Sequence, residues 1–264
     1  MGPGRDGGVT HVPKWDVTAS GLVLFHPQGT LVVDVGNSSH FAEEIAEYGP
    51  YDHFFLANLP GSNRPVATAP DALRAIGADP DALFGVVISH GHVDHAGGLV
   101  DLPKAPIYLA AEERGFIEGT LKKRIVDVVP AQARSMEGRM HVLVFEKKPY
   151  ETFDESADLF CDGSVVVVKL FGHTPGSVGT FVNLSPSLRV FHVGDSVNVV
   201  EAVDRRLTKS VVMRATDDDF GRADEAVAEI ARLHEAAPEI AILPAHDRSA
   251  WKRVFGAAPG CIAR

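Results

Sequence analysis

The segment Ser89-His90-Gly91-His92-Val93-Asp94-His95 constrains the fold of this chain more than any other stretch. The apolar run before it, from Gly85 to Ser89, has the length of a buried strand, so we expect a strand that delivers the chain into His90 and a tight loop after it. Imidazole nitrogens and carboxylate oxygens are the natural ligands of zinc and similar cations. The segment therefore predicts a metal site at the end of a strand.

Three later apolar strands are predicted to end in the same way. His173 follows the run 165–170, Asp195 follows 189–193, and His246 follows 240–243. Because all four strand ends deliver side chains that ligate metals, we expect them to meet at one shared rim. Burying so many ionisable groups without a cation would be very costly, which favours a metal site over a polar network in the core.

The remaining pattern predicts strands at 22–25 and 30–35 around the turn Pro27-Gln28-Gly29, and a short strand at 107–109. Helices are expected at 39–48, 71–76 and 217–236, the last with one apolar face. Strand groups followed by helices predict an α/β chain with two mixed sheets packed together and helices outside. We expect one domain over residues 1–264, with a flexible lead-in at 1–14 and two similar halves at about 15–150 and 151–264.

Composition limits the partners and the compartment. The formal net charge of -10 argues against nucleic acid, because a phosphate backbone favours clustered Lys and Arg. The one dense basic run, Lys122-Lys123-Arg124, is expected to be a solvated helix face. Two cysteines, Cys161 and Cys261, provide no disulfide framework, and no segment approaches the roughly 20 apolar residues of a membrane span. With no apolar run of a signal peptide at the start, a cytoplasmic protein without a membrane partner is expected.

From about Ser20 to Trp251, these motifs resemble the metallo-β-lactamase superfamily. The resemblance implies an αββα sandwich with a dinuclear metal site. By motif, His90, His92 and His173 would bind the first metal, and Asp94, His95 and His246 the second. Asp195 would bridge the two. Zinc is the expected ion, with Mn²⁺, Fe²⁺ and Co²⁺ as alternatives, because such donors accept all four.

Two divalent ions about 3.5–4 Å apart can share a hydroxide whose pKa is lowered towards 7, and such a bridging hydroxide attacks carbonyl or phosphoryl centres. Asp94 is a candidate to orient this nucleophile or to take up a proton. Ligating histidines usually donate their second N–H to a carboxylate or carbonyl. The resemblance makes Asp34 the best candidate for that role, because the superfamily commonly has an Asp at this strand end. Ser89, Thr174 and Asp247 follow, and the alternative for Asp34 is a plain strand-end cap.

Within the superfamily, the length, ligand set and spacing are most similar to the N-acyl-homoserine lactonase-like branch. This resemblance implies a small-molecule substrate and hydrolysis of a lactone or carboxylic ester. That branch often has a Tyr three residues after the bridging Asp, whereas this chain has Asn198, which could donate a hydrogen bond to the substrate carbonyl instead. Hydrolysis of thioesters, phosphotriesters or β-lactams stays open, as does a non-hydrolytic iron-dependent oxygenase or a metal sensor.

Other histidines and aromatic residues carry no motif. Seven histidines are expected on the surface or in the core: His11, His26, His40, His53, His141, His192 and His234. Four aromatic residues between the two halves are expected to pack in the core, with a substrate-facing wall as the alternative: Phe116, Phe145, Tyr150 and Phe153.

Overall fold

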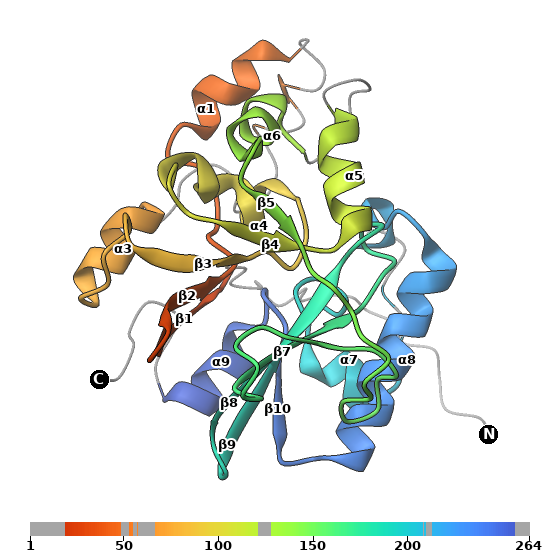
Figure 1. Cartoon of the computed structure of the whole chain (residues 1–264). Helices are drawn as coiled ribbons and strands as arrows, with labels where there is room; N and C mark the ends of the chain where they lie inside the picture. The colour runs from red at the N-terminus through yellow and green to blue at the C-terminus, as the bar shows by residue number, and fades with distance from the viewer. Residues whose placement is uncertain are drawn as a thin grey trace, which may run out of the picture.

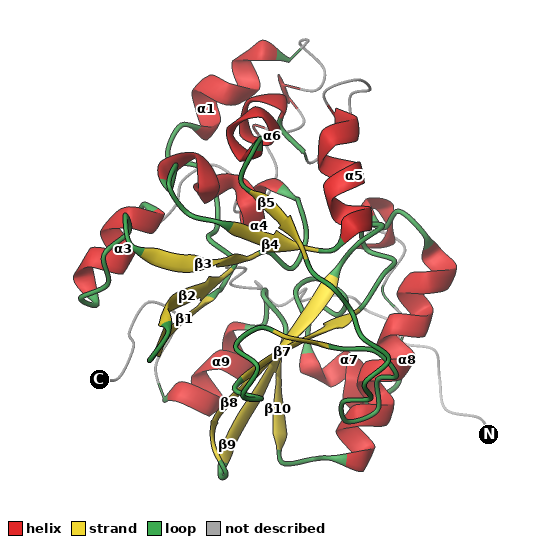
Figure 2. Ribbon diagram, in the orientation of Figure 1, coloured by secondary structure: helices red, strands yellow, loops and turns green. Residues whose placement is uncertain are grey.

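The computed structural model describes residues 19–48, 53, 54, 57, 67–120, 128–207, 209 and 213–256. Two five-stranded sheets pack against each other, and helices cover the outer face of each (Figure 1, Figure 2). The predicted αββα sandwich is confirmed. Predictions that lie outside the described residues concern the lead-in 1–14, His11, the basic run Lys122-Lys123-Arg124 and Cys261.

The first sheet has its strands in chain order: β1 (Leu22–His26), β2 (Gly29–Val33), β3 (Leu83–Val87), β4 (Ile107–Leu109) and β5 (Met140–Val142). β1 and β2 form the predicted antiparallel hairpin, and β2 to β5 pair in parallel. Since β2 and β3 are parallel, the residues that follow them, Asp34 and Ser89, lie at the same edge of the sheet.

The second sheet has the order β10 (Ile240–Leu243), β9 (Leu188–His192), β8 (Val178–Ser185), β7 (Val165–Lys169) and β6 (Ala157–Asp158). β8 is antiparallel to both β7 and β9, and β9 is parallel to β10. β7, β9 and β10 therefore run in the same direction. Their carboxyl ends, followed by His173, Asp195 and His246, meet at one edge.

Helices cover the two outer faces. On the first sheet lie α3 (Ala69–Ala75), α5 (Ala111–Thr120) and α6 (Pro130–Met136), and on the second lie α7 (Val200–Asp204) and α8 (Phe220–Ala236). Shorter elements are α1 (Phe41–Glu44), α4 (Val93–Ala96) and the 3-10 turns Ile45–Glu47, Gly97–Asp101 and Met213–Thr216; α9 (Arg248–Phe255) follows β10. Among the described residues no helix combines the length and the apolar character needed to cross a membrane.

Strand β7 shows why the central strands are apolar on both sides. Val165 and Val167 pack between the sheets against Val182, Val190 and Leu243. Val166 and Val168 point to the other face, because successive side chains alternate, and pack under α8 against Val227 and Ile230. The core between the sheets draws on both halves of the chain, so each sheet buries its inner face against the other.

The predicted strands and the helices at 71–76 and 217–236 are present, with ends that differ by a few residues. The helix expected at 39–48 is a short α-helix that continues as a 3-10 turn. The sequence analysis did not predict α9, which begins because the Asp247 carboxylate accepts a hydrogen bond from the Ala250 N–H.

Candidate metal centre

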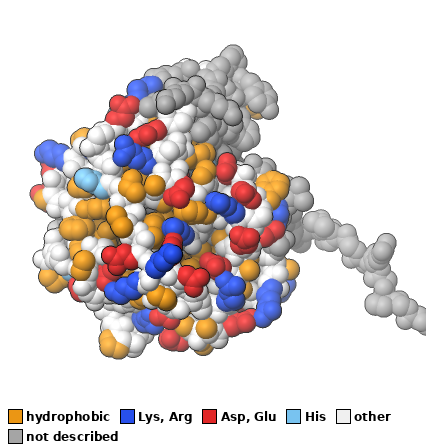
Figure 3. All heavy atoms as spheres, turned by 45° about the vertical axis from the view of Figure 1, so that its right-hand side comes forward, with side chains coloured by type: hydrophobic (Ala, Val, Ile, Leu, Met, Phe, Trp, Pro, Cys, Tyr) orange, Lys and Arg blue, Asp and Glu red, His pale blue; other side chains and the backbone are white. Residues whose placement is uncertain are grey.

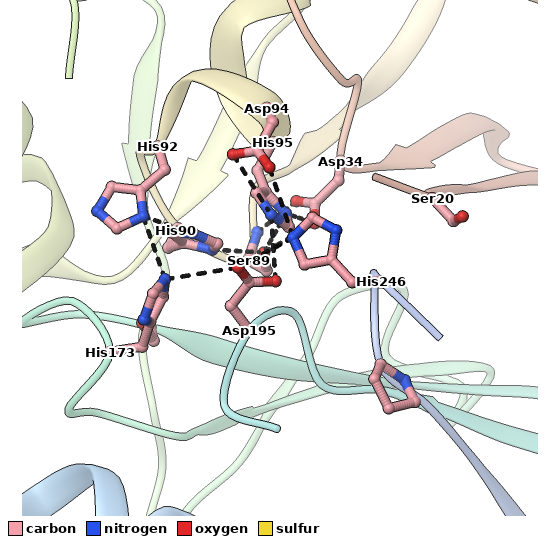
Figure 4. A network of polar contacts seen from close by, with 12 residues as sticks. Ser20, Asp34, Ser89, His90, His92, Asp94, His95, His173, Asp195 and His246 are labelled. Atoms are coloured by element: carbon pink, nitrogen blue, oxygen red, sulfur yellow. Dashed lines mark hydrogen bonds and ion pairs between the residues drawn. The ribbon is translucent and has the colours of Figure 1, made fainter. Parts of the chain in front are cut away.

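The predicted ligands converge where the strand ends of the two sheets meet (Figure 4). The loop after β3 supplies His90 and His92, and the short helix α4 supplies Asp94 and His95. The loops after β7, β9 and β10 supply His173, Asp195 and His246 from the opposite sheet. The structure thus brings all seven predicted residues to one place.

His90, His92 and His173 form the first cluster. The Nδ1 atom of His92 lies 3.1 Å from the Nε2 atoms of both His90 and His173. All three side chains are buried. Burial lowers the pKa of each of the three below the ordinary value for histidine. The neighbouring imidazoles add to this effect for His90 and His92, and the Lys209 ammonium adds to it for His173. Neutral imidazoles with converging nitrogens offer lone pairs to a cation.

Asp94, His95 and His246 form the second cluster. The His246 Nε2 atom lies 3.4 Å from Asp94 Oδ2, and the His95 Nε2 atom lies 3.8 Å from Asp94 Oδ1. Burial opposes the charge of both histidines, but the carboxylates of Asp195 and Asp94 outweigh it and raise the pKa of His95 and His246. In the metal-free protein this cluster therefore attracts positive charge.

Asp195 lies between the two clusters. Its Oδ1 atom is 3.3 Å from His95 Nε2, and its Oδ2 atom is 3.1 Å from His246 Nε2 and 3.7 Å from His173 Nε2. Burial opposes the ionised carboxylate, but His246 and His95 outweigh it and hold the pKa of Asp195 well below its ordinary value. Among the predicted ligands it is the carboxylate in contact with histidines of both clusters.

The donor set fits divalent cations. The Nε2 atom of His95 and the Oδ1 atom of Asp195 lie 3.3 Å apart and are both buried, and neither makes a hydrogen bond within the described part of the chain. Such orphaned groups cost free energy unless something satisfies them. Three groups of donor atoms lie close enough to hold a metal: His90, His92 and His173; His90, His95 and Asp195; and Asp94, His95 and His246.

Asp34 occupies the place expected for an outer carboxylate. It accepts hydrogen bonds from the Ser89 N–H (2.6 Å), the Ser89 hydroxyl (2.7 Å) and His95 Nδ1 (2.8 Å). Its φ of 55° lies in the left-handed region, where side chains other than Gly are strained. Because His95 Nδ1 is engaged by Asp34, the other ring nitrogen, Nε2, faces Asp195 and Asp94.

Replacing Asp34 by Asn is expected to weaken metal binding by about 10–100-fold, the usual cost of losing an outer partner. Asn tolerates the left-handed backbone but carries no charge to hold the His95 proton. Competition titration with a chelator measures the change. Asp81→Asn alters a carboxylate with 58% exposure and is the matched control, which is expected to leave metal affinity unchanged. Unchanged metal affinity in Asp34→Asn would contradict the assigned role.

His173 has an outer partner that the sequence analysis did not predict. Its Nδ1 atom lies 2.8 Å from Asp217 Oδ1, which also accepts a hydrogen bond from Lys209 Nζ at 2.5 Å. Burial opposes the ionised Asp217, but His173 and Lys209 outweigh it and lower its pKa. Asp217 lies 44 residues after His173 in the chain, and no motif joins the two.

Glu113 is a second residue that the sequence analysis missed. Its carboxylate is fully buried and accepts hydrogen bonds from the loops of His90 and His173. Burial raises its pKa to about 7 against those hydrogen bonds. A signal was available, since Glu113, Ile117 and Thr120 have the spacing of one helix face and are the buried residues of α5.

The other predicted site residues have different surroundings. The Ser89 hydroxyl donates to Asp34 and lies 3.0 Å from His90 Nδ1, as expected of an outer partner. Thr174 donates to Glu113, and Asp247 caps α9 and accepts from Val200 N–H, so their recorded side-chain hydrogen bonds are not with a ligand. Asn198 is half-buried in the loop between β9 and α7, and its role stays a prediction.

The histidines without a motif lie outside the three metal-binding groups, as far as they are described. His192 is fully buried, and its Nε2 atom lies 3.2 Å from the Ser20 carbonyl oxygen. Of the four aromatic residues, Phe153 packs in the core under α8, and the Tyr150 hydroxyl accepts a hydrogen bond from the side-chain amide of Asn183. Phe145 packs against the core between the sheets. Phe116 differs, because its ring centroid lies 6.3 Å from that of His92, beside the first cluster.

Known proteins share this sequence pattern and fold. A "probable metallo-hydrolase" of Mycobacterium tuberculosis is 28% identical over 239 residues, which are 86% of this chain and 73% of the relative. The N-acyl homoserine lactonase AttM of Rhizobium radiobacter is 22% identical over 245 residues, 90% of this chain and 84% of AttM. A solved structure of an AiiA mutant from B. thuringiensis, with N-decanoyl-L-homoserine bound at its active site, superposes with a TM-score of 0.67 at 19% identity, over 90% of this chain and 85% of that one.

A match to a protein-family model identifies the family of this chain. Residues 13–246 match the model of the metallo-beta-lactamase superfamily, a range that contains every residue of both clusters. With the metallo-hydrolase relatives and the cluster of metal-binding side chains, this makes the protein a metal-dependent hydrolase. The chain belongs to the metallo-beta-lactamase superfamily.

Proposed function

We propose that this hydrolase opens the lactone ring of N-acyl-homoserine lactones. Water adds to the ring carbonyl, the ring C–O bond breaks, and the products are an N-acyl-homoserine carboxylate and one proton. The observation that carries the proposal is the similarity to the lactonase AttM over 90% of the chain. The chain also has three groups of side chains that could hold a metal ion, at the edge where the two sheets meet.

The metal roles follow the geometry. We propose that the first cluster holds one cation, the second cluster holds another, and Asp195 contacts both, because its two oxygens face histidines of both clusters. Two bound cations would supply a hydroxide at neutral pH and polarise the substrate carbonyl. Zinc is the proposed metal, since imidazole and carboxylate donors suit it. A cytoplasmic location is part of the proposal.

Three residues of the chain are assigned to the substrate. Asp94 is the ligand with the most exposed side chain, at 30%, against 12% for Asp195 and 13% for His246. It can therefore face the substrate and take up a proton as the ring opens. Asn198, three residues after Asp195, can donate an amide N–H to the carbonyl oxygen. Phe116, beside His92, offers an apolar surface next to the first cluster.

A panel of short-chain and long-chain N-acyl-homoserine lactones tests the proposal. In a pH-stat, the metal-loaded protein is expected to release one equivalent of acid per lactone consumed, with the ring-opened product confirmed by mass spectrometry. A thioester, a phosphotriester and a cephalosporin belong in the same panel. Metal-dependent turnover of one of these, with none of any lactone, would overturn the lactonase assignment and retain the hydrolase. Oxygen consumption without hydrolysis would instead point to an oxygenase.

A further inference from the structure

The side chain of Glu113 connects the two loops that build the first cluster. Its Oε1 atom accepts from the Gly91 N–H at 2.6 Å, in the loop between His90 and His92. Its Oε2 atom accepts from the Thr174 hydroxyl at 2.6 Å and from the Gly176 N–H at 3.0 Å, in the loop that follows His173. One buried carboxylate thus holds a loop from each sheet.

The packing around Glu113 leaves little freedom in this arrangement. A Cβ atom built on Gly176 would lie 2.2 Å from the Glu113 backbone nitrogen, closer than real atoms approach. A Cβ atom on Gly91 would lie 2.7 Å from the Ile117 side chain and 3.1 Å from the Glu113 carboxylate. Both loops therefore come directly against α5 because glycine stands at each contact.

Placing a carboxylate in this buried space costs free energy, because the charged group loses its hydration. The side chain has no exposed surface, and burial raises its pKa to about 7. An apolar side chain of similar size would fill the same volume without the cost of desolvating a carboxylate. What an apolar side chain could not do is accept three hydrogen bonds from two separate loops.

We propose that Glu113 is a positioning residue that fixes the spacing between His173 and the His90–His92 pair, and thereby sets the metal affinity of the first cluster. This inference rests on the proposed two-metal site and is independent of the substrate. The bonds to Thr174 and Gly176 act on the loop of His173, which belongs to the first cluster alone. The second cluster takes its distant ligand, His246, from the loop after β10, where Glu113 makes none of these hydrogen bonds.

Glu113→Gln tests the proposal with Co²⁺ as the probe, in a competition titration that follows the visible absorption of each bound ion. Gln has the same size, and its carbonyl can still accept from one loop. Its amide nitrogen cannot accept from a backbone N–H, so the hydrogen bond from Gly91 or the one from Gly176 is lost, and either loss weakens the link between the two loops. We expect the ion of the first cluster to be bound about 10–100-fold more weakly, the usual cost of losing an outer partner. We expect the affinity for the ion of the second cluster to be unchanged.

Two further variants complete the test. Glu112→Gln changes the exposed neighbour on the same helix and is expected to bind both ions as the unmodified protein does. Thr174→Val removes the hydroxyl donor from the other side of the link while keeping the shape of the side chain, and it reports on the link even if Glu113→Gln does not fold. It is expected to weaken the same ion, and the double variant is expected to be weaker by less than the product of the two single effects, because both changes break one link.

The outcomes separate this inference from the two-metal site itself. Equal weakening of both ions in step with a lower Tm would reduce Glu113 to a structural residue, as would unchanged binding in both Glu113→Gln and Thr174→Val. An unmodified protein that binds no Co²⁺ would overturn the metal site and Glu113's role with it. Two bound ions without lactone turnover would remove the proposed substrate and leave the inference on Glu113 intact.

Discussion

Protein stripped of metal by a chelator is expected to hydrolyse its substrate more slowly by on the order of a thousandfold or more, because the ions supply the nucleophile at neutral pH. The residues of both clusters cannot replace that chemistry. The first cluster consists of imidazoles, each with a pKa below the ordinary value. In the second cluster, burial opposes the charge of His95 and His246, but Asp195 and Asp94 outweigh it and raise the pKa of both histidines.

The measurement is the rate of acid release before and after dialysis against a chelator, with metal content determined by elemental analysis. Adding back Zn²⁺, Mn²⁺ or Co²⁺ is expected to restore activity, and the ion that gives the highest rate at stoichiometric amounts indicates the preferred metal. A far-ultraviolet circular dichroism spectrum controls for unfolding. Full activity in folded protein shown to be free of metal would refute the metal-dependent mechanism.

The variant Asp195→Asn is expected to weaken binding of both metal ions, each by more than about a hundredfold, the upper end of the loss seen for an outer partner. Asp195 is placed between the clusters, with its oxygens 3.1 Å from His246 Nε2 and 3.3 Å from His95 Nε2. Asn keeps the shape but removes one negative charge from between two cations. In a buried site that charge is poorly screened, so the loss is large.

The comparison with His246→Ala makes this prediction specific. His246 belongs to the second cluster, so its loss is expected to cost one ion while the first cluster keeps the other. Asp218→Asn, at an exposed carboxylate on the loop before α8, is the matched control and is expected to bind both ions. Elemental analysis and chelator competition give the stoichiometry. If Asp195→Asn lost only one ion, Asp195 would be a ligand of a single metal.

The strand ends that carry the metal-binding residues were the features predicted best from the sequence. Val165–Lys169 and Leu83–Val87 are apolar because both faces of each strand are covered, so their ends and the ligands after them stand out. The extents of the helices were predicted less accurately from the sequence. The helix expected at 39–48 includes a 3-10 turn, and α9 is short, with a cap at Asp247 that was assigned to the site instead.

The residues that hydrogen-bond to the metal-binding side chains or to their loops were the hardest to predict from the sequence. Asp34 was predicted because it lies at the end of a predicted strand, where the metallo-β-lactamase superfamily commonly has an Asp. Asp217 and Lys209 reach His173 through chain separations that no local pattern records. Glu113 lies on α5, away from every motif, and only its place on the buried helix face distinguishes it from Glu112.

The sequence by itself determined which residues could bind metal and that strands would present them, because donor chemistry and the alternation of apolar runs are local properties. The tertiary structure decided how the donors divide into two clusters, with Asp195 between them, and which buried carboxylates hold the loops in place. Those relations depend on the shared direction of β7, β9 and β10. They also depend on the packing of α5 against one loop from each sheet. Contacts of that kind join distant parts of the chain, and hydrophobic packing fixes them only when the whole sandwich has formed.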